Sequence, residues 1–123
     1  MKPPSCTLPA DATLRKKSQY DTLREKGIMK RGSFFHLALL PLNPSESTMT
    51  RCGFIASSRV GNAVARNRAK RLLRELYRRE RSRILSPSWM ALIATPQITK
   101  ATFAQLKEEW NRLLKKFPFL NIL

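Results

Sequence analysis

Apolar residues along the chain fall into segments with either a helical or a strand-like period. The clearest helical stripe begins after Thr102, where apolar side chains recur every three or four positions: Phe103, Leu106, Trp110, Leu113, Leu114 and Phe117. Thr102 and Gln105 form a capping-box pattern at its start, and Pro118 ends it. The spacing therefore predicts a helix whose apolar face packs in the core.

Three shorter apolar segments have the length and composition of strands. They cover residues 33–42, 51–58 and 89–95, and turn-forming residues bound them. The turn chemistry of residues 43–47 predicts that the first two form an antiparallel hairpin with a long loop. In the first strand, alternation places two sets of side chains on opposite faces: Phe35, Leu37 and Leu39 in the core, and Phe34, His36 and Ala38 on the other side.

Two further helices are predicted from periodicity and end signals. A short helix covers roughly residues 19–26, with Ser18 as N-cap, Asp21 in a capping-box position and Gly27 at its end. A long helix runs from Ala63 to about Ile84. The resulting order, helix, strand, strand, helix, strand, helix, predicts an α+β sandwich in which helices pack on one mixed sheet.

The domain organisation follows from the same pass along the chain. Residues 1–13 are rich in Pro, Ser and Thr and have no periodicity, so we expect a flexible N-terminal arm. Residues 14–117 are expected to form one domain, which suits a chain of 123 residues, and residues 118–123 an apolar C-terminal tail that packs on the core.

The net charge of +16 is extreme for a domain of this size. Because such self-repulsion disfavours a compact state, a polyanionic partner is expected: nucleic acid first, an anionic membrane second and an acidic protein third. No apolar run approaches the ~20 residues of a membrane-spanning helix, and the Pro-rich first residues lack the apolar run that a signal peptide would have. Two cysteines in different contexts and one histidine predict no metal site, but free thiols in a reducing cytoplasm.

Half of the net charge lies between Arg59 and Arg83, because this stretch contains ten basic residues and only two acidic ones, Glu75 and Glu80. On a helix these residues separate into two faces, an apolar arc of Ala65, Ala69, Leu72, Leu73 and Leu76, and an opposite face of Arg66, Lys70, Arg71, Arg74, Arg78 and Arg81.

A solvated charged face is the ordinary interpretation of such a run. Two features oppose it here. Like charges four residues apart repel one another along the helix, and Arg66 and Arg68 lie near the helix N-terminus, where the macrodipole disfavours cations. We therefore predict that this face binds the phosphate backbone of a nucleic acid.

The run Val60-Gly61-Asn62-Ala63-Val64-Ala65-Arg66-Asn67-Arg68-Ala69-Lys70-Arg71, with Arg74 three residues on, resembles the characteristic motif of the bacterial ribonuclease P protein subunit. The resemblance extends from about Leu14 to Phe117. It implies a four-stranded, mostly antiparallel sheet, the order αβββαβα and a left-handed crossover. It also implies the protein subunit of a ribonucleoprotein endonuclease whose RNA subunit cuts the 5′ leader from precursor tRNA with Mg²⁺.

The resemblance also implies roles for particular residues. One set would bind the catalytic RNA: Arg59, Asn62, Arg66, Asn67, Arg68, Lys70, Arg71 and Arg74. A second set would line a cleft for the single-stranded leader: Tyr20, Arg24, Phe34 and His36. Arg24 stands where many members have an aromatic residue, so leader binding would depend more on charge. For His36, a histidine satisfied within its strand is the simpler alternative.

No constellation of residues suited to catalysis or metal binding is apparent, so the protein is expected to bind and position RNA. The implied partners are ribonuclease P RNA and precursor tRNA, with a monomeric protein in a 1:1 complex with the RNA, no membrane and a cytoplasmic location. A ribosomal or RNA-assembly protein is the alternative function. A DNA-binding module is a second one, although the basic face offers few Asn or Gln side chains for reading bases.

Overall fold

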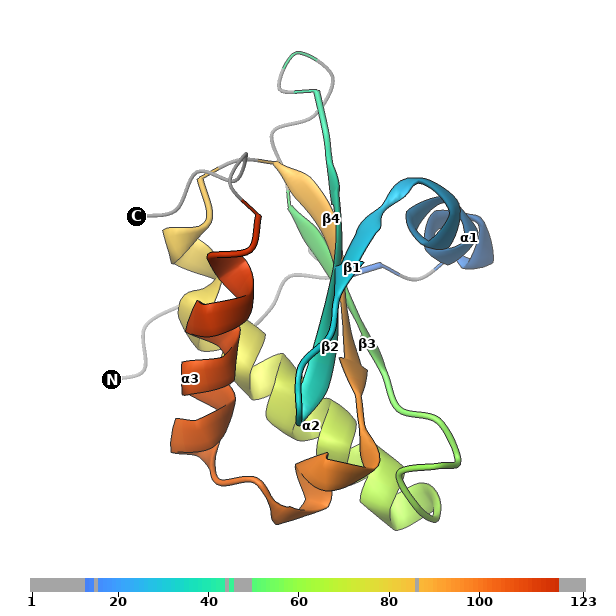
Figure 1. Ribbon diagram of the computed structural model, residues 1–123. Coiled ribbons are helices and arrows are strands. Elements are labelled where there is room, and N and C mark those ends of the chain that lie inside the picture. The colour runs from blue at the N-terminus through green and yellow to red at the C-terminus, as the bar shows by residue number, and fades with distance from the viewer. Residues whose placement is uncertain (1–12, 15, 44, 46–49, 86, 118–123) are drawn as a thin grey trace, which may run out of the picture.

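A four-stranded sheet divides the protein into two unequal layers of helices. The computed structural model describes residues 13–14, 16–43, 45, 50–85 and 87–117. Helices α2 (Ala63–Glu80) and α3 (Phe103–Leu114) cover one face of the sheet, and α1 (Lys17–Lys26) packs on the other (Figure 1). Because α1 is a single short helix, part of that second face stays open.

The sheet has the strand order β1-β2-β4-β3. Its β1–β2 and β2–β4 pairs are antiparallel and its β3–β4 pair is parallel, which confirms a mixed, mostly antiparallel sheet. The bounds are Ile28–Lys30 for β1, Phe35–Pro41 for β2, Arg51–Ile55 for β3 and Ser88–Ala94 for β4. Strand β1 is the one strand that the apolar pattern did not predict; a fourth strand was expected only from the family resemblance. The left hand of the β3–α2–β4 crossover stays a prediction.

The predicted hairpin between the first two apolar segments is wrong. Strands β2 and β3 do not pair, because β4 lies between them and is hydrogen-bonded to both. Strand β4 is apolar along almost its whole length, which suits a strand that has a neighbour on each side within the sheet.

Two helix ends also differ from their predictions. Helix α1 begins at Lys17 rather than after Ser18, and the backbone N–H of its N-cap, Lys16, donates to Gln19 Oε1 at 3.1 Å. Helix α2 ends at Glu80, and residues 81–83 continue as a short 3-10 helix, η3 (Arg81–Arg83). The capping box of α3 is confirmed, since Thr102 and Gln105 exchange both hydrogen bonds. The arm and the tail lie outside the described residues, apart from residue 13.

The main core lies between the sheet and helices α2 and α3. Phe35, Leu37 and Leu39 are fully buried in it, as the alternation predicted. Phe34 departs from the alternation, because it precedes β2 and packs against this same core cluster. In α2 the predicted apolar arc faces the core except for Ala65, which lies outside it, and Tyr77 packs edge-on against Trp110 of α3.

A buried carboxylate fixes the turn between β1 and β2. Glu109 of α3 is 2% exposed and accepts the backbone N–H groups of Ser33 at 2.6 Å, Phe34 at 2.7 Å and Phe35 at 3.0 Å. Arg112, one helical turn further, donates to the same carboxylate at 2.6 Å. The distant helix α3 thus satisfies backbone donors that the turn cannot satisfy itself.

Candidate nucleic-acid interface

The motif region opens with a turn that exposes the N-terminus of α2. Gly61 has a φ of 148°, a conformation that favours glycine, and Asn62 follows as the N-cap. The Asn62 side chain accepts the backbone N–H of Ala65 at 2.9 Å. Asn62 therefore has a structural role in starting α2, besides any contact with RNA.

Five cations of the motif form the basic helix face, which we define as Arg66, Arg68, Lys70, Arg71 and Arg74. Each has an exposed or half-exposed side chain. No carboxylate within the described part of the chain forms an ion pair with any of the five. Their charge is therefore available to an external anion.

The later arginines of the same helix are paired within the protein. Glu75 accepts hydrogen bonds from both Arg78 and Arg79, and Glu80 accepts one from Arg83. The hydrogen bond from Arg78 is the main cause that lowers the pKa of Glu75. The Glu75 carboxyl therefore stays ionised. The cations up to Arg74 are thus unpaired, whereas Arg78, Arg79 and Arg83, at and just beyond the end of α2, are paired with glutamates.

On the opposite side of the sheet, small residues create a groove beneath α1. Gly53, Ala91 and Ala38 are cross-strand neighbours on β3, β4 and β2, and Met29 of β1 continues the row. Short side chains in this row let α1 approach the sheet and leave a groove of about 200 Å³. We call it the α1 groove; its lining residues are Tyr20, Leu23, Arg24, Gly27, Met29, Ala38, Ile55, Ala91 and Ile93.

Tyr20 lies directly over Gly53. A Cβ atom at position 53 would overlap the phenol ring of Tyr20, so glycine is required for this placement. The Tyr20 hydroxyl donates to the Leu14 carbonyl oxygen at 3.0 Å. Burial raises the pKa of Tyr20, and the positive charge of Arg74 partly opposes that shift. The ring is therefore neutral, held in place and half-exposed.

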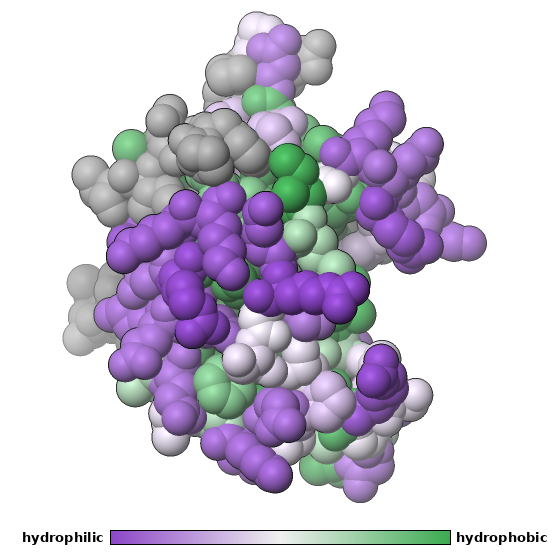
Figure 2. Space-filling model, in the orientation of Figure 1, coloured by the Kyte–Doolittle hydropathy of each residue, from purple (hydrophilic) through white to green (hydrophobic). Residues whose placement is uncertain are grey.

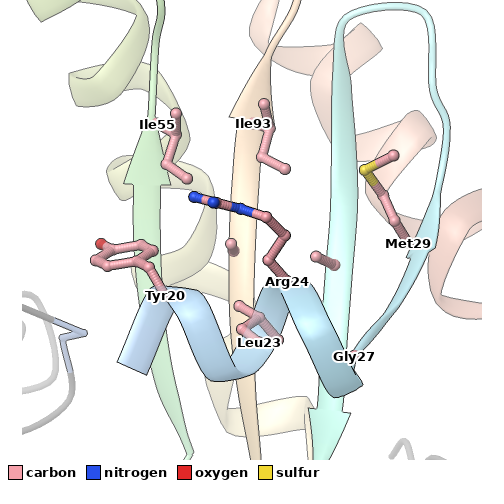
Figure 3. A pocket seen from close by; sticks show the side chains of 9 residues that line it. Tyr20, Leu23, Arg24, Gly27, Met29, Ile55 and Ile93 are labelled. Atoms are coloured by element: carbon pink, nitrogen blue, oxygen red, sulfur yellow. The ribbon is translucent and has the colours of Figure 1, made fainter. Parts of the chain in front are cut away.

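The other predicted cleft residues lie in three different places. Arg24 projects from α1 toward the sheet beside Ile55 and Ile93 (Figure 3), and its side chain is mostly exposed. His36 is the cross-strand neighbour of Ile93, so it lies on the same face beyond the groove, without lining it. Phe34 does not line the groove and packs on the core side.

His36 has a local hydrogen bond. Its Nδ1 atom accepts the backbone N–H of Gly32 at 3.1 Å, and burial followed by the charge of Arg31 lowers its pKa. This hydrogen bond joins His36 to the β1–β2 turn, and a contact of His36 with the leader stays a prediction.

The two candidate surfaces meet at the outer strand β3. Arg74 lies with its guanidinium carbon 5.2 Å from the centre of the Phe54 ring on β3, and its charge also reaches Tyr20. In Figure 2, α1 forms a mostly hydrophilic lobe on the right, and the surface is hollowed below it.

The described residues contain no group of three or more His, Cys, Asp or Glu side chains that could hold a metal ion. Within the same ranges, no helix is long and apolar enough to cross a membrane. What the surface does offer is unpaired cations, a helix N-terminus and a ring beside an open sheet face. These features, on an α+β sandwich, define a nucleic-acid-binding protein.

Comparisons with known proteins specify the class further. The family model described as Ribonuclease P matches residues 8–118, so the chain belongs to the ribonuclease P protein family. A ribonuclease P protein component of Desulforapulum autotrophicum is 34% identical over 112 residues, which are 91% of this chain and 93% of the relative. One from Chloroflexus aurantiacus is 35% identical over 104 residues, 84% of this chain and 75% of the relative.

The fold agrees with solved structures of the family. The RNase P protein of Staphylococcus aureus superposes with a TM-score of 0.74 at 26% identity, over 85% of this chain and 94% of that one. The family assignment makes the chain a subunit of the ribonuclease P endoribonuclease, a ribonucleoprotein of tRNA processing, and its partner the ribonuclease P RNA. The alternative of a ribosomal or assembly protein is not favoured by these comparisons.

Proposed function

We propose that this protein docks on ribonuclease P RNA through the basic helix face and holds the 5′ leader of precursor tRNA in the α1 groove. The observation that carries the proposal is the unpaired state of Arg66, Arg68, Lys70, Arg71 and Arg74 beside an exposed helix N-terminus. Unpaired cations at such a terminus are the usual phosphate-binding arrangement of proteins.

Leader binding is the second part of the proposal. The α1 groove has apolar walls, one half-exposed ring and one exposed guanidinium, Arg24. Stacking on a ring and attraction to a cation both tolerate any base sequence. Such a groove suits an enzyme that must accept many different leaders, and it supports precursor tRNA as the substrate.

Catalysis in this proposal belongs to the RNA subunit, with one protein bound to each RNA in the cytoplasm. We assign the Mg²⁺ ions to the RNA, since the described residues offer no clustered ligands for them. Arg66 and Arg68 would then act indirectly, by ordering the RNA that retains the ions.

The test is a pair of double variants with the same loss of charge. Arg66→Ala/Arg68→Ala should weaken binding to ribonuclease P RNA, lower the salt slope by about two and raise the Mg²⁺ requirement of precursor-tRNA cleavage. Lys107→Ala/Lys115→Ala removes two exposed cations, one from α3 and one from its C-cap, and serves as the matched control. Equal RNA affinity and Mg²⁺ dependence of the two variants would contradict the proposal.

A further inference from the structure

A second pocket lies beside the N-terminal half of α2, and neither the basic helix face nor the α1 groove accounts for it. It encloses about 420 Å³ between α2 and η4 (Pro96–Lys100), within the size range of pockets that bind small ligands. We call it the α2–η4 pocket. Its floor includes Ala69 and Ile98, which are 2% and 1% exposed.

The walls of this pocket are apolar although the surrounding surface is cationic. Val64 lines it and is 76% exposed, a high value for a large apolar side chain. Leu72 and Ala101 line it as well, and both pack partly on the core. An open apolar pocket costs free energy in water, so a group that covers it would be stabilised there.

The rim is polar and carries positive charge. Arg68 lines the pocket and belongs to the basic helix face, so an apolar group bound here would lie next to a phosphate site. Asn62 uses its Oδ1 atom to cap α2, which leaves its amide NH2 group as a donor. Thr99 donates its hydroxyl to the Pro96 carbonyl oxygen at 3.1 Å, which leaves the hydroxyl oxygen as an acceptor.

Flat apolar faces, polar edges and an attached anion are together the chemistry of a nucleotide. A guanidinium such as that of Arg68 also stacks on bases, and proteins read RNA mostly through unstacked bases in loops and bulges. An acidic apolar peptide matches less well, because Arg68 is one of five unpaired cations on the same helix, a density of positive charge that suits consecutive phosphates. We infer that the α2–η4 pocket binds one unstacked nucleobase of the catalytic RNA; this inference rests on the proposed function.

Filling the pocket without changing charge tests the inference. Ala101→Leu should weaken binding to ribonuclease P RNA by about tenfold, within the range that one stacked base contributes. Its salt slope should equal that of the wild type, because no cation is lost. Val64→Ser removes part of an exposed wall and should lower the affinity a few fold. Ala104→Leu is the control, since it makes the same change at an exposed position of α3 outside the pocket.

A photocrosslinker locates the contact directly. With p-benzoylphenylalanine at position 64, the protein should crosslink to one or two adjacent nucleotides of the RNA, and Ala101→Leu in the same chain should abolish the crosslink. Urea unfolding of each variant shows whether it is folded. If Ala101→Leu does not fold, the RNA affinity of Val64→Ser and the crosslink from position 64 test the inference.

Two results would overturn the inference. One is wild-type RNA affinity in the folded pocket variants together with scattered or absent crosslinks. The other is self-association of the wild-type protein that Ala101→Leu removes, which would assign the pocket to a second copy of this chain. If Arg66→Ala/Arg68→Ala weakens binding while the pocket variants do not, the pocket inference fails and the proposed function stands.

Discussion

At the scale of single residues, the site depends on side chains that are absent as much as on those that are present. Gly53 carries no side chain, and the Tyr20 ring occupies the space that one would fill. Ala91 and Ala38, the next residues across the sheet from Gly53, have short side chains that leave room for the α1 groove. The Tyr20 ring is therefore positioned by two contacts: its face packs on the sheet at Gly53, and its hydroxyl donates to the Leu14 carbonyl oxygen.

Substitutions at this contact should separate stacking from hydrogen bonding. Tyr20→Ala and Gly53→Ala should each lower affinity for precursor tRNA by about tenfold, since one removes the ring and the other displaces it. Tyr20→Phe keeps the ring and should bind the leader normally, but lose about 1 kcal/mol of folding stability with the hydrogen bond. Fluorescence anisotropy with precursor tRNA and with leaderless tRNA measures the effect. Equal losses for both RNAs would exclude a leader contact.

At the scale of elements, α2 combines two halves with different electrostatics. Its cations from Arg66 to Arg74 are unpaired, whereas three arginines at the end of α2 and in η3 are paired with two glutamates. The division explains why one helix can carry both a docking surface and a stable end that packs against α3.

Removing the acid in the middle of α2 should extend the docking surface. Glu75→Gln releases Arg78 and Arg79, so log-log plots of RNA affinity against salt should become steeper by about one or more. Glu108→Gln on α3 removes the same charge from an exposed position and should leave the slope nearly unchanged. If both variants behave alike, only the net charge matters and the pairing at Glu75 is irrelevant to RNA binding.

The β1–β2 turn depends on α3 for its hydrogen bonds. Glu109→Ala leaves three backbone N–H groups without their acceptor and should lower the free energy of unfolding by about 3 kcal/mol. Glu108→Ala, its exposed neighbour, should change it by less than about 0.5 kcal/mol. Urea unfolding of the two variants makes the comparison, and a similar stability of both would show that water replaces the carboxylate.

At the scale of the whole molecule, the thiol of Cys52 in the main core can report whether the protein is folded. Cys52 of β3 is fully buried in the main core, and burial raises the pKa of its thiol well above the ordinary value. In a Cys6→Ser background, Cys52 should resist thiol reagents at pH 8 in the native protein and react at once in urea. Fast labelling without denaturant would mean that β3 opens locally, without global unfolding.

The strand pairing shows where prediction from the sequence ends. Apolar segments 33–42 and 51–58 were correctly predicted as strands, but their neighbours were not, because apolar strands offer few local clues to their partners. Short β1 carries too few residues to give a period. Phe34 illustrates the same limit, since its face is decided by a turn that Glu109 organises from 75 positions away.

What the sequence determined by itself is the information carried by residues close together in the chain. The apolar and cationic faces of α2, the capping box of α3 and the motif from Val60 to Arg74 all belong to this kind, because a helix repeats every few residues. Only the tertiary structure decided which strands pair, that Gly53 lies beneath Tyr20, and that Glu109 holds the β1–β2 turn. These contacts join segments far apart in the chain, and their geometry exists only after the sheet has formed and the core has packed.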